Sequence, residues 1–392
     1  MGTPEVAICG IGAVTGYGWG RERLWEGLLS GKPAATLVGG YGVDRTESAW
    51  LARVPDGGDP GDGTSRFSRA VRAAAREAIG DAEGRGWRPG ARVGVLHAVV
   101  GGDIDEWQQF LTVDRGHRRV RDFPAMMSST PVSNIMREFG FHGPALNVSA
   151  MCASGNAGLL TAKSWLDQGI ADDVVVVATD LSLSPEIVEH FVRLGVAVTD
   201  APPLSACRPF QEGSRGFGMG EASVALVLSR RASRPYTEVL GGAVSHDAHH
   251  AVSIDPQPSR LFGCFREALA DAGVEPGRVR YLNAHGPGTA QCSRAETAVL
   301  DELLPPAARV YSVKPLTGHC QGAAAAVEIA VAALGYDGGV LPAPPVLGGG
   351  HRQLLRGPVR VEGGVTVKSS LGMGGHNTVV VLAPPSSRPV DD

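Results

Sequence analysis

Four consecutive valines, at positions 174–177, constrain the fold of this chain more than any other feature of its sequence. An apolar β-branched run without polar alternation is typical of a strand that is buried on both faces, as in a sheet covered by helices. Such strands are expected at residues 6–8, 93–99, 173–178, 222–228 and 378–382, with a weaker one at 236–240. Helices are expected between them at residues 66–82, 158–168, 259–272 and 323–334. This alternation predicts an α/β protein with a largely buried sheet.

Length and composition narrow the class of protein. The chain has 392 residues, and its net charge of −4 includes no long basic run, so neither nucleic acid nor an anionic membrane surface is an expected partner. No apolar stretch reaches the roughly 18 residues of a membrane span. The N-terminus lacks the basic and apolar regions of a secretory signal, which predicts a cytoplasmic protein. A polar break at residues 230–235 separates two halves.

The six cysteines are scattered and show no spacing typical of a metal site, so being a cysteine is no sign of catalysis. Cys152 differs by its context, because small residues surround it and a helix-forming run follows. A thiol at a helix start feels the positive end of the helix dipole, which is expected to lower its pKa. Small neighbours let a thioester approach and leave backbone N–H groups for an oxyanion. Cys152 is therefore a candidate nucleophile, with a buried structural cysteine as the alternative.

Two histidines and a lysine lie at strand or helix ends further along the chain. His285 ends a strand-like run before a Gly-Pro-Gly turn, where a side chain can face a cleft. Lys314 and His319 flank a turn that leads into an alanine-rich helix, and Glu328 lies within that helix. A cation, a histidine and a carboxylate at a helix start suit anion binding and histidine orientation. An exposed lysine and ordinary loop histidines are the alternatives.

Glycine-rich turns raise the question of phosphate binding. The segment 372–377 has three glycines, but it leads into a strand and no Gly-Lys-Ser/Thr follows, so a phosphate cradle is not expected. The glycines of residues 10–16 have the wrong spacing for a dinucleotide loop.

Taken together and in this order, the segments resemble the β-ketoacyl synthases of the thiolase superfamily over nearly the whole chain. Cys152 falls at the family's nucleophile, and His285 matches the histidine of its HGTGT motif. The SVK…GH pair is matched by Lys314 and His319. Glu328 aligns with the acidic residue of the following helix. Further matches lie at residues 6–15, 24–28, 208–210, 216–221 and 372–377.

The resemblance implies a thiolase fold, in which two similar α/β halves stack as five αβαβα layers. Residues 1–235 would form the half with the nucleophilic cysteine, and residues 236–392 the half with the catalytic histidines. The family implies a homodimer, or a heterodimer with a related ketosynthase-like subunit. It also implies an elongating condensing enzyme of polyketide, other specialised or fatty-acid biosynthesis. Its substrates would be carried on the phosphopantetheine of an acyl carrier protein, with no other cofactor and no metal.

The resemblance also assigns roles to residues. Cys152 would carry the acyl group while a malonyl-type extender loses carbon dioxide. His285 and His319 would stabilise the resulting enolate, and Lys314 with Glu328 would set the local field and hold the histidines. Thr289 is expected in a supporting role, and Met373 at the gate. The backbone N–H groups of Cys152 and Met373 would form an oxyanion hole. Phe191 and His376 are candidate pocket residues.

Four positions depart from the family pattern, and one of them is Ser293, which stands where the family often has an aspartate. Pro287 replaces a threonine of the HGTGT motif and supplies neither a hydroxyl nor an N–H group. Met373 replaces the usual phenylalanine of the gate with a more flexible side chain, and His376 replaces a threonine with a bulkier titratable group. These changes bear on acyl specificity and on the extender step.

Two other functions stay open at this point. An acyltransferase would use the same cysteine but pass the acyl group to an amine, an alcohol or a carrier without condensation. A non-catalytic subunit of a ketosynthase heterodimer is the other, although such subunits usually lack the cysteine that Cys152 supplies. A thiolase or a coenzyme-A-primed synthase fits less well, because those relatives pair their histidine with a second cysteine or an asparagine.

Overall fold

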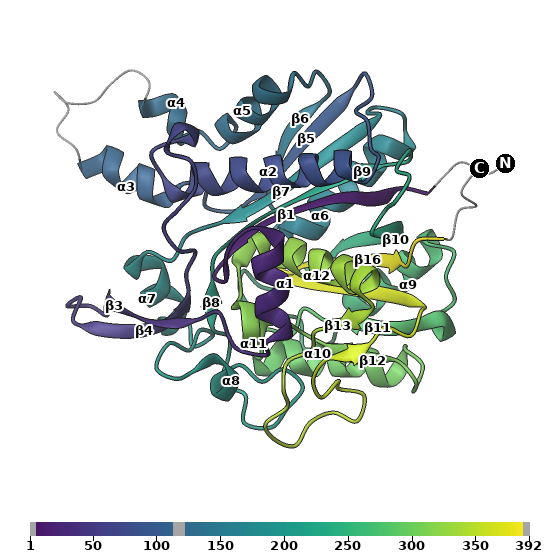
Figure 1. Ribbon diagram of the computed structural model, residues 1–392. Helices are drawn as coiled ribbons and strands as arrows, with labels where there is room; N and C mark the ends of the chain where they lie inside the picture. Colours follow the sequence, from purple (N-terminus) through teal and green to yellow (C-terminus); the bar gives the residue numbers. More distant parts are fainter. Residues whose placement is uncertain (1–4, 113–121, 387–392) are drawn as a thin grey trace.

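Strands from both halves of the chain join in one eleven-stranded sheet (Figure 1). The computed structural model describes residues 5–112 and 122–386. In them the strand order is β12-β11-β15-β16-β10-β1-β9-β7-β5-β6, with β2 beside β1. The first half contributes β1 (Ala7–Thr15), β2 (Gly18–Trp19), β5 (Val93–Val99), β6 (Ala145–Val148), β7 (Asp173–Asp180) and β9 (Ala222–Ser229). The second contributes β10 (Thr237–His246), β11 (Val279–Asn283), β12 (Arg309–Tyr311), β15 (Val365–Gly372) and β16 (His376–Ala383).

Helices cover both faces of this sheet and fill the space between its two halves. Helix α2 (Arg66–Gly84) packs outside β1, β7 and β9, whereas α9 (Ser259–Asp271) packs outside β10 and β16. On the α9 side, α10 (Ala290–Glu302) shares a core with β11 and β15. Helices α6 (Ser154–Asp167) and α12 (Ala324–Gly338) contact each other and strands of both halves. Figure 1 shows the layers in the order α2, sheet, α6 with α12, sheet, and α9 with α10. These are the five αβαβα layers that the family resemblance implies.

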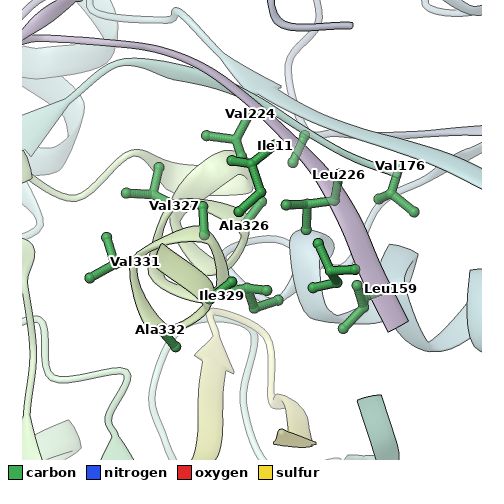
Figure 2. Close-up of a cluster of buried hydrophobic side chains, with 14 of the residues drawn as sticks. Ile11, Leu159, Val176, Val224, Leu226, Ala326, Val327, Ile329, Val331 and Ala332 are labelled. Carbon is green, nitrogen blue, oxygen red and sulfur yellow. The ribbon is translucent and has the colours of Figure 1, made fainter. Parts of the chain in front are cut away.

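The central layer explains the alanine-rich sequence of α12. Its residues from Ala324 to Gly335 are all buried, because strands and α6 surround the helix. Figure 2 shows Ala326, Val327 and Ile329 of this helix in one cluster with Val224 and Leu226 of β9. The crossing with α6 is close: a Cβ atom added to Gly155 would lie 2.7 Å from the backbone nitrogen of Ala326.

The predicted elements are all present, most of them with shifted ends. Strand β5 has the predicted bounds, while β10 extends six residues beyond its predicted end, to His246. Helix α6 begins at Ser154, four residues before its predicted start, because the turn at Cys152 leads directly into it. The predicted boundary between residues 235 and 236 falls in the connection from β9 to β10.

The other elements lie at the edges of this core. A small sheet contains β3 (Thr36–Tyr41), β4 (Glu47–Ala52) and β8 (Met219–Gly220), and β13 (Val340–Leu341) pairs with β14 (Val359–Arg360). The remaining helices are α1 (Arg21–Leu29), α3 (Ile104–Thr112), α4 (Asp122–Met126), α5 (Thr130–Phe139), α7 (Pro185–Arg193), α8 (Pro203–Ala206) and α11 (Lys314–Thr317). Of the helices in the described part of the chain, none has the length and apolar character needed to cross a membrane.

Candidate active site

Cys152 lies in the tight turn between β6 and α6. Met151, just before it, has a φ of 50°, a left-handed conformation uncommon for a residue with a Cβ atom. The backbone N–H of Ser154 donates to the Met151 carbonyl at 3.0 Å, and the Ser154 hydroxyl donates to the same oxygen at 2.6 Å. The same Ser154 oxygen accepts the N–H of Ala150 at 2.9 Å. These bonds hold Cys152 at the start of the helix, as the sequence predicted.

A cavity of about 380 Å³ brings residues from distant segments together. Cys152, His285, His319, Met373 and Thr289 all line it. They come from the β6–α6 turn, the loops after β11 and α11, and the β15–β16 turn. Loops of the second half supply four of these residues, and the packing of the two halves adds Cys152 to them.

The two histidines face each other, with ring centroids 5.4 Å apart. Nδ1 of His319 accepts the backbone N–H of Gln321 at 3.1 Å, so the neutral ring carries its proton on Nε2. Burial, with a further contribution from the positive charge of Lys314, holds the pKa of His285 and the pKa of His319 well below 6.5. Both rings are therefore neutral near pH 7, and His319 offers an N–H donor.

The pKa of the Cys152 thiol differs from what the sequence led us to expect. Burial raises the pKa of Cys152 to about 11, although Lys314 and the backbone N–H groups of Met373 and Cys152 act in the opposite direction. The expected lowering of the pKa by the helix dipole is wrong for this structure, because the loss of water outweighs it. The same two N–H groups lie close enough to the sulfur to act as its hydrogen-bond donors.

A buried ionic cluster lies behind the histidines. Lys314 Nζ donates to the carbonyl oxygen of His285 and pairs with Oε1 of Glu328. The other oxygen of Glu328 lies 2.8 Å from Nζ of Lys368. All three charged side chains are at most 2% exposed. The cluster fixes the backbone at His285 and adds positive charge near both rings.

Comparisons with known proteins agree with this geometry. A family model of the β-ketoacyl synthase N-terminal domain matches residues 59–233, and one of the C-terminal domain matches residues 236–346. A Streptomyces rimosus protein named as an oxytetracycline polyketide β-ketoacyl synthase 1 is 30% identical over 422 residues, covering 97% of each chain. The chain belongs to the β-ketoacyl synthase family.

Other relatives of this synthase come from fatty-acid and polyketide systems. The 3-oxoacyl-(acyl-carrier-protein) synthase 2 of Staphylococcus aureus is 29% identical over 404 residues, covering 96% of this chain and 98% of the relative. A solved complex of a type II polyketide acyl-carrier protein with its ketosynthase aligns with a TM-score of 0.87 at 22% identity, over 98% of this chain and 100% of the other. The ishigamide ketosynthase/chain length factor aligns with a TM-score of 0.84 at 25% identity, with the same coverage. The synthase thus has the thiolase fold, and it is a condensing enzyme of the acyltransferase class.

Two candidate pocket residues of the synthase are not among the described residues that line the cavity. Phe191 is absent from the described residues that line it and packs instead on Phe217, at 6.0 Å between centroids, and Phe217 in turn contacts the ring of His319 at 4.8 Å. His376 is absent from that lining as well and faces His246 across strands β16 and β10, with centroids 4.9 Å apart.

The departures at Pro287 and Met373 both lie on the cavity wall. The carbonyl of Pro287 accepts the thiol of Cys207 at 3.3 Å, so the loop is held without the hydroxyl that the family threonine supplies. Met373 is the first residue of the turn between β15 and β16, followed by Gly374 and Gly375 with φ of 87° and 91°. Because both glycines adopt the left-handed region, this turn needs residues without a Cβ atom. The backbone conformation therefore explains why glycines occur here, and no phosphate-binding role is needed to explain them.

Glu296 shapes the loop that carries His285. Its carboxylate accepts the backbone N–H groups of His285 and Gly286, each at 2.8 Å, and the hydroxyl of Ser369 at 2.7 Å. Gly286 has a φ of 41°, and a Cβ atom there would lie 2.6 Å from Cβ of Ser312. The loop therefore depends on one buried carboxylate and one glycine.

Sequence reasoning missed Lys368. It lies in β15, where a single lysine among apolar and small residues gives no sign of its partner. Its carbonyl oxygen also accepts the side-chain amide of Asn156 from α6 at 3.3 Å. Glu328 lies 40 residues earlier in another layer, so no local pattern could have linked the two.

Proposed function

We propose that this synthase catalyses a decarboxylative Claisen condensation between an acyl group on Cys152 and a malonyl-type thioester of an acyl carrier protein. The observation that carries this proposal is the shared cavity of Cys152, His285 and His319, with both imidazoles neutral. A nucleophile and neutral N–H donors in one buried cavity suit acyl transfer followed by enolate formation.

In the first half-reaction, the Cys152 sulfur attacks the acyl thioester carbonyl, and the pantetheine sulfur departs. Because burial raises the pKa of the thiol to about 11, the cysteine starts protonated, and its proton ends on the departing pantetheine thiol. In this proposal the backbone N–H groups of Cys152 and Met373, which act on the sulfur, also donate to the negative oxygen of the tetrahedral intermediate.

In the second half-reaction, the carboxylate of the extender leaves as carbon dioxide, and the electron pair of the broken bond moves to the thioester oxygen. Nε2–H of His319 donates to this enolate oxygen, and His285 completes the site beside it. The α-carbon then attacks the acyl carbonyl, the bond to Cys152 sulfur breaks, and the thiolate takes up a proton. Lys314 and Glu328 hold the His285 backbone through these steps.

The proposed partners are an acyl carrier protein, whose phosphopantetheine supplies the substrates without another cofactor, and a second ketosynthase-like chain. Strand β6 ends the described sheet, and Leu146 on it is 55% exposed. An apolar edge strand of this kind is suited to pairing with another chain. This feature supports a homodimer or a heterodimer, with residues 1–235 and 236–392 as the two halves of each subunit. We place the enzyme in the cytoplasm, where its six free cysteines stay reduced.

Intact-protein mass spectrometry tests the proposal. The protein is mixed with a panel of acyl-carrier thioesters, and malonyl-carrier protein is then added. Acylation followed by release of carbon dioxide and a ketoacyl product two carbons longer is the expected result. Acylation that discharges to an amine or alcohol without carbon dioxide would identify a non-condensing acyltransferase instead. Acylation that malonyl carrier discharges only after a related subunit is added would identify one half of a heterodimer.

Two variants separate the half-reactions. Cys152→Ala is expected to abolish acylation, whereas the control Cys264→Ala, which removes a buried thiol in α9, keeps it. Acylation of another residue in Cys152→Ala would refute the assigned nucleophile. His319→Ala is expected to acylate but to lose about 100-fold or more in decarboxylation, as for the loss of one oxyanion donor. An unchanged condensation rate in His319→Ala would refute the role given to His319. The control for this variant is His351→Ala, because His351 lines another cavity.

A further inference from the structure

Lys368 adds a second buried lysine to the ionic cluster behind the histidines. Its Nζ lies 2.8 Å from one carboxylate oxygen of Glu328, and the other oxygen of Glu328 pairs with Lys314. Nζ of Lys368 also donates to the carbonyl of Ser369 and, at 3.2 Å, to the hydroxyl of Ser370. The side chain is fully buried, and Lys368 is not among the described residues that line the cavity. It therefore acts on a substrate only through the groups around it.

The charges of this cluster do not cancel. Lys314 and Glu328 alone would form a neutral pair, and Lys368 adds one positive charge to them. Burial lowers the pKa of Lys368 below 10.5, and the carboxylate of Glu328 acts in the opposite direction. Glu296 is a further buried carboxyl near the cluster, and it accepts two backbone N–H groups and the Ser369 hydroxyl. Lys368 therefore decides whether the cluster is neutral or positive.

The positive charge of the cluster opposes protonation of both catalytic rings. Burial is the largest cause of the low pKa of each ring, and the charges of Lys314 and Lys368 lower both pKa values further. The hydrogen bonds agree with neutral rings, because a charged imidazolium donates from both nitrogens. Nδ1 of His319 accepts an N–H group, and Nδ1 of His285 has no partner among the described residues. The other titratable groups around the rings are Cys152, Cys292 and Arg215 on the cavity wall, and the buried carboxyls of Asp180, Glu296 and Glu328.

The charge of the rings decides what happens to the enolate. Loss of carbon dioxide leaves an electron pair that is shared between the thioester oxygen and the α-carbon. A neutral N–H group donates a hydrogen bond to the oxygen and keeps its proton, so the α-carbon can attack the acyl group. An imidazolium would instead transfer its proton to the α-carbon. That transfer yields an acetyl thioester and a neutral imidazole, and no carbon–carbon bond forms.

We propose that Lys368 keeps His285 and His319 uncharged and thereby protects the enolate from protonation until it attacks the acyl group. This inference rests on the proposed function, because it concerns the enolate of a condensing enzyme. Lys368 acts through the two histidines, so it is a positioning residue and not a catalytic one. Its removal should convert part of the extender into a dead-end acetyl thioester.

The test measures the two products of the extender. The protein is acylated with its preferred acyl-carrier thioester, malonyl-carrier protein is added at a series of pH values, and mass spectrometry gives the ratio of acetyl-carrier to ketoacyl-carrier protein. Lys368→Met and Lys368→Gln both remove the charge, and the glutamine keeps a polar group beside Glu328. Each variant should raise the ratio about tenfold, as for a rise of about one unit in the pKa of the rings. The ratio should also grow as the pH falls, because the charged fraction of the rings grows.

Two control variants separate the charge of Lys368 from its packing. Ser370→Ala removes a hydrogen-bond acceptor of Lys368 and keeps the charge. Lys163→Met removes the charge of a lysine in α6 that pairs with Asp167. Both controls should keep the product ratio of the unmodified protein. The rate of Cys152 acylation, which precedes enolate formation, should be the same in all variants.

Each outcome decides one question. An unchanged ratio in both Lys368 variants, or a raised ratio that does not depend on pH, would refute the role of Lys368 and leave the condensation standing. An equal rise in Ser370→Ala would show that packing and not charge controls the enolate, which also refutes the proposal. The absence of any ketoacyl product from the unmodified protein, with every acyl-carrier thioester, would refute the proposed function itself.

Discussion

Glu328 is shared by two buried lysines, and replacing it with glutamine is expected to destabilise the protein strongly. One carboxylate oxygen pairs with Lys314 and the other lies 2.8 Å from Lys368, with all three side chains at most 2% exposed. The backbone carbonyl of Glu328 accepts the amide of Asn283 at 2.8 Å, a bond that the glutamine keeps. Glu328→Gln therefore changes the charge of the cluster and little else.

The magnitude follows from the charges that remain. Opposite unit charges 2.8 Å apart attract by about 6 kcal/mol at an effective dielectric constant of about 20, most of which is offset by desolvation. Removing one partner of a buried pair costs about 3–5 kcal/mol, because the other charge stays buried and unpaired. Glu328→Gln leaves two buried lysines unpaired. We therefore expect the free energy of unfolding to fall by about 5 kcal/mol, near the upper end of this range. Lys368→Met leaves Lys314 paired with Glu328, so we expect the free energy of unfolding to fall by less than about 2 kcal/mol.

Urea unfolding of four proteins measures these differences: the unmodified protein, Glu328→Gln, Lys368→Met and the double variant. The double variant should be more stable than Glu328→Gln alone, because one of the two unpaired charges has gone. Lys163→Met, at a partly exposed pair with Asp167 in α6, is the matched control and should change the free energy of unfolding by less than about 1 kcal/mol. Equal losses for Glu328→Gln and Lys368→Met, or additive losses in the double variant, would refute the reasoning.

Two further predictions concern packing and pH. Gly155→Ala should lower the free energy of unfolding by about 1–3 kcal/mol, because the added Cβ atom would lie 2.7 Å from the Ala326 nitrogen. For His97, burial lowers the pKa to about 4, so between pH 6.5 and about 4 the unfolded chain binds a proton that the folded protein does not. Stability is therefore lost as the pH falls through this window, by about 1.4 kcal/mol per pH unit from this residue, and His97→Leu should remove that part of the slope.

Urea unfolding checks both predictions. Gly263→Ala in α9 is the control for the first, because a Cβ atom there meets nothing within 4 Å and should raise stability by about 0.5–1 kcal/mol. Equal effects of the two glycine substitutions would contradict a close crossing of α6 and α12. Parallel stability curves of His97→Leu and the unmodified protein from pH 7 to pH 4 would contradict a buried neutral histidine.

Much of the fold could be predicted from local patterns. Runs such as residues 93–99 and 173–178 have no polar alternation, and strands with both faces covered produce that pattern directly. Element ends were less predictable, because they depend on contacts outside the segment. Strand β10 continues to His246 since its later residues pair with β16, and α6 starts at Ser154 since its serine bonds the Cys152 turn.

The candidate site could be predicted in part. The positions of Cys152, His285 and His319 follow from short motifs in a fixed order, and the cavity brings all three together. The pKa of Cys152 could not be predicted, because a helix dipole is visible in sequence but the depth of burial is not. The placement of Phe191 and His376 away from the cavity lining also depends on packing that no local pattern describes.

The sequence by itself determined the alternating strands and helices, the turns that need glycine, and the set of motifs that mark a β-ketoacyl synthase. Each of these depends on residues close together in the chain. The tertiary structure alone decided that Lys368 shares Glu328 with Lys314 and that burial raises the pKa of the Cys152 thiol. The physical reason is that the energy of a charge depends on which groups surround it once water is removed. Those groups come from layers that are distant in sequence and meet only when the two halves pack.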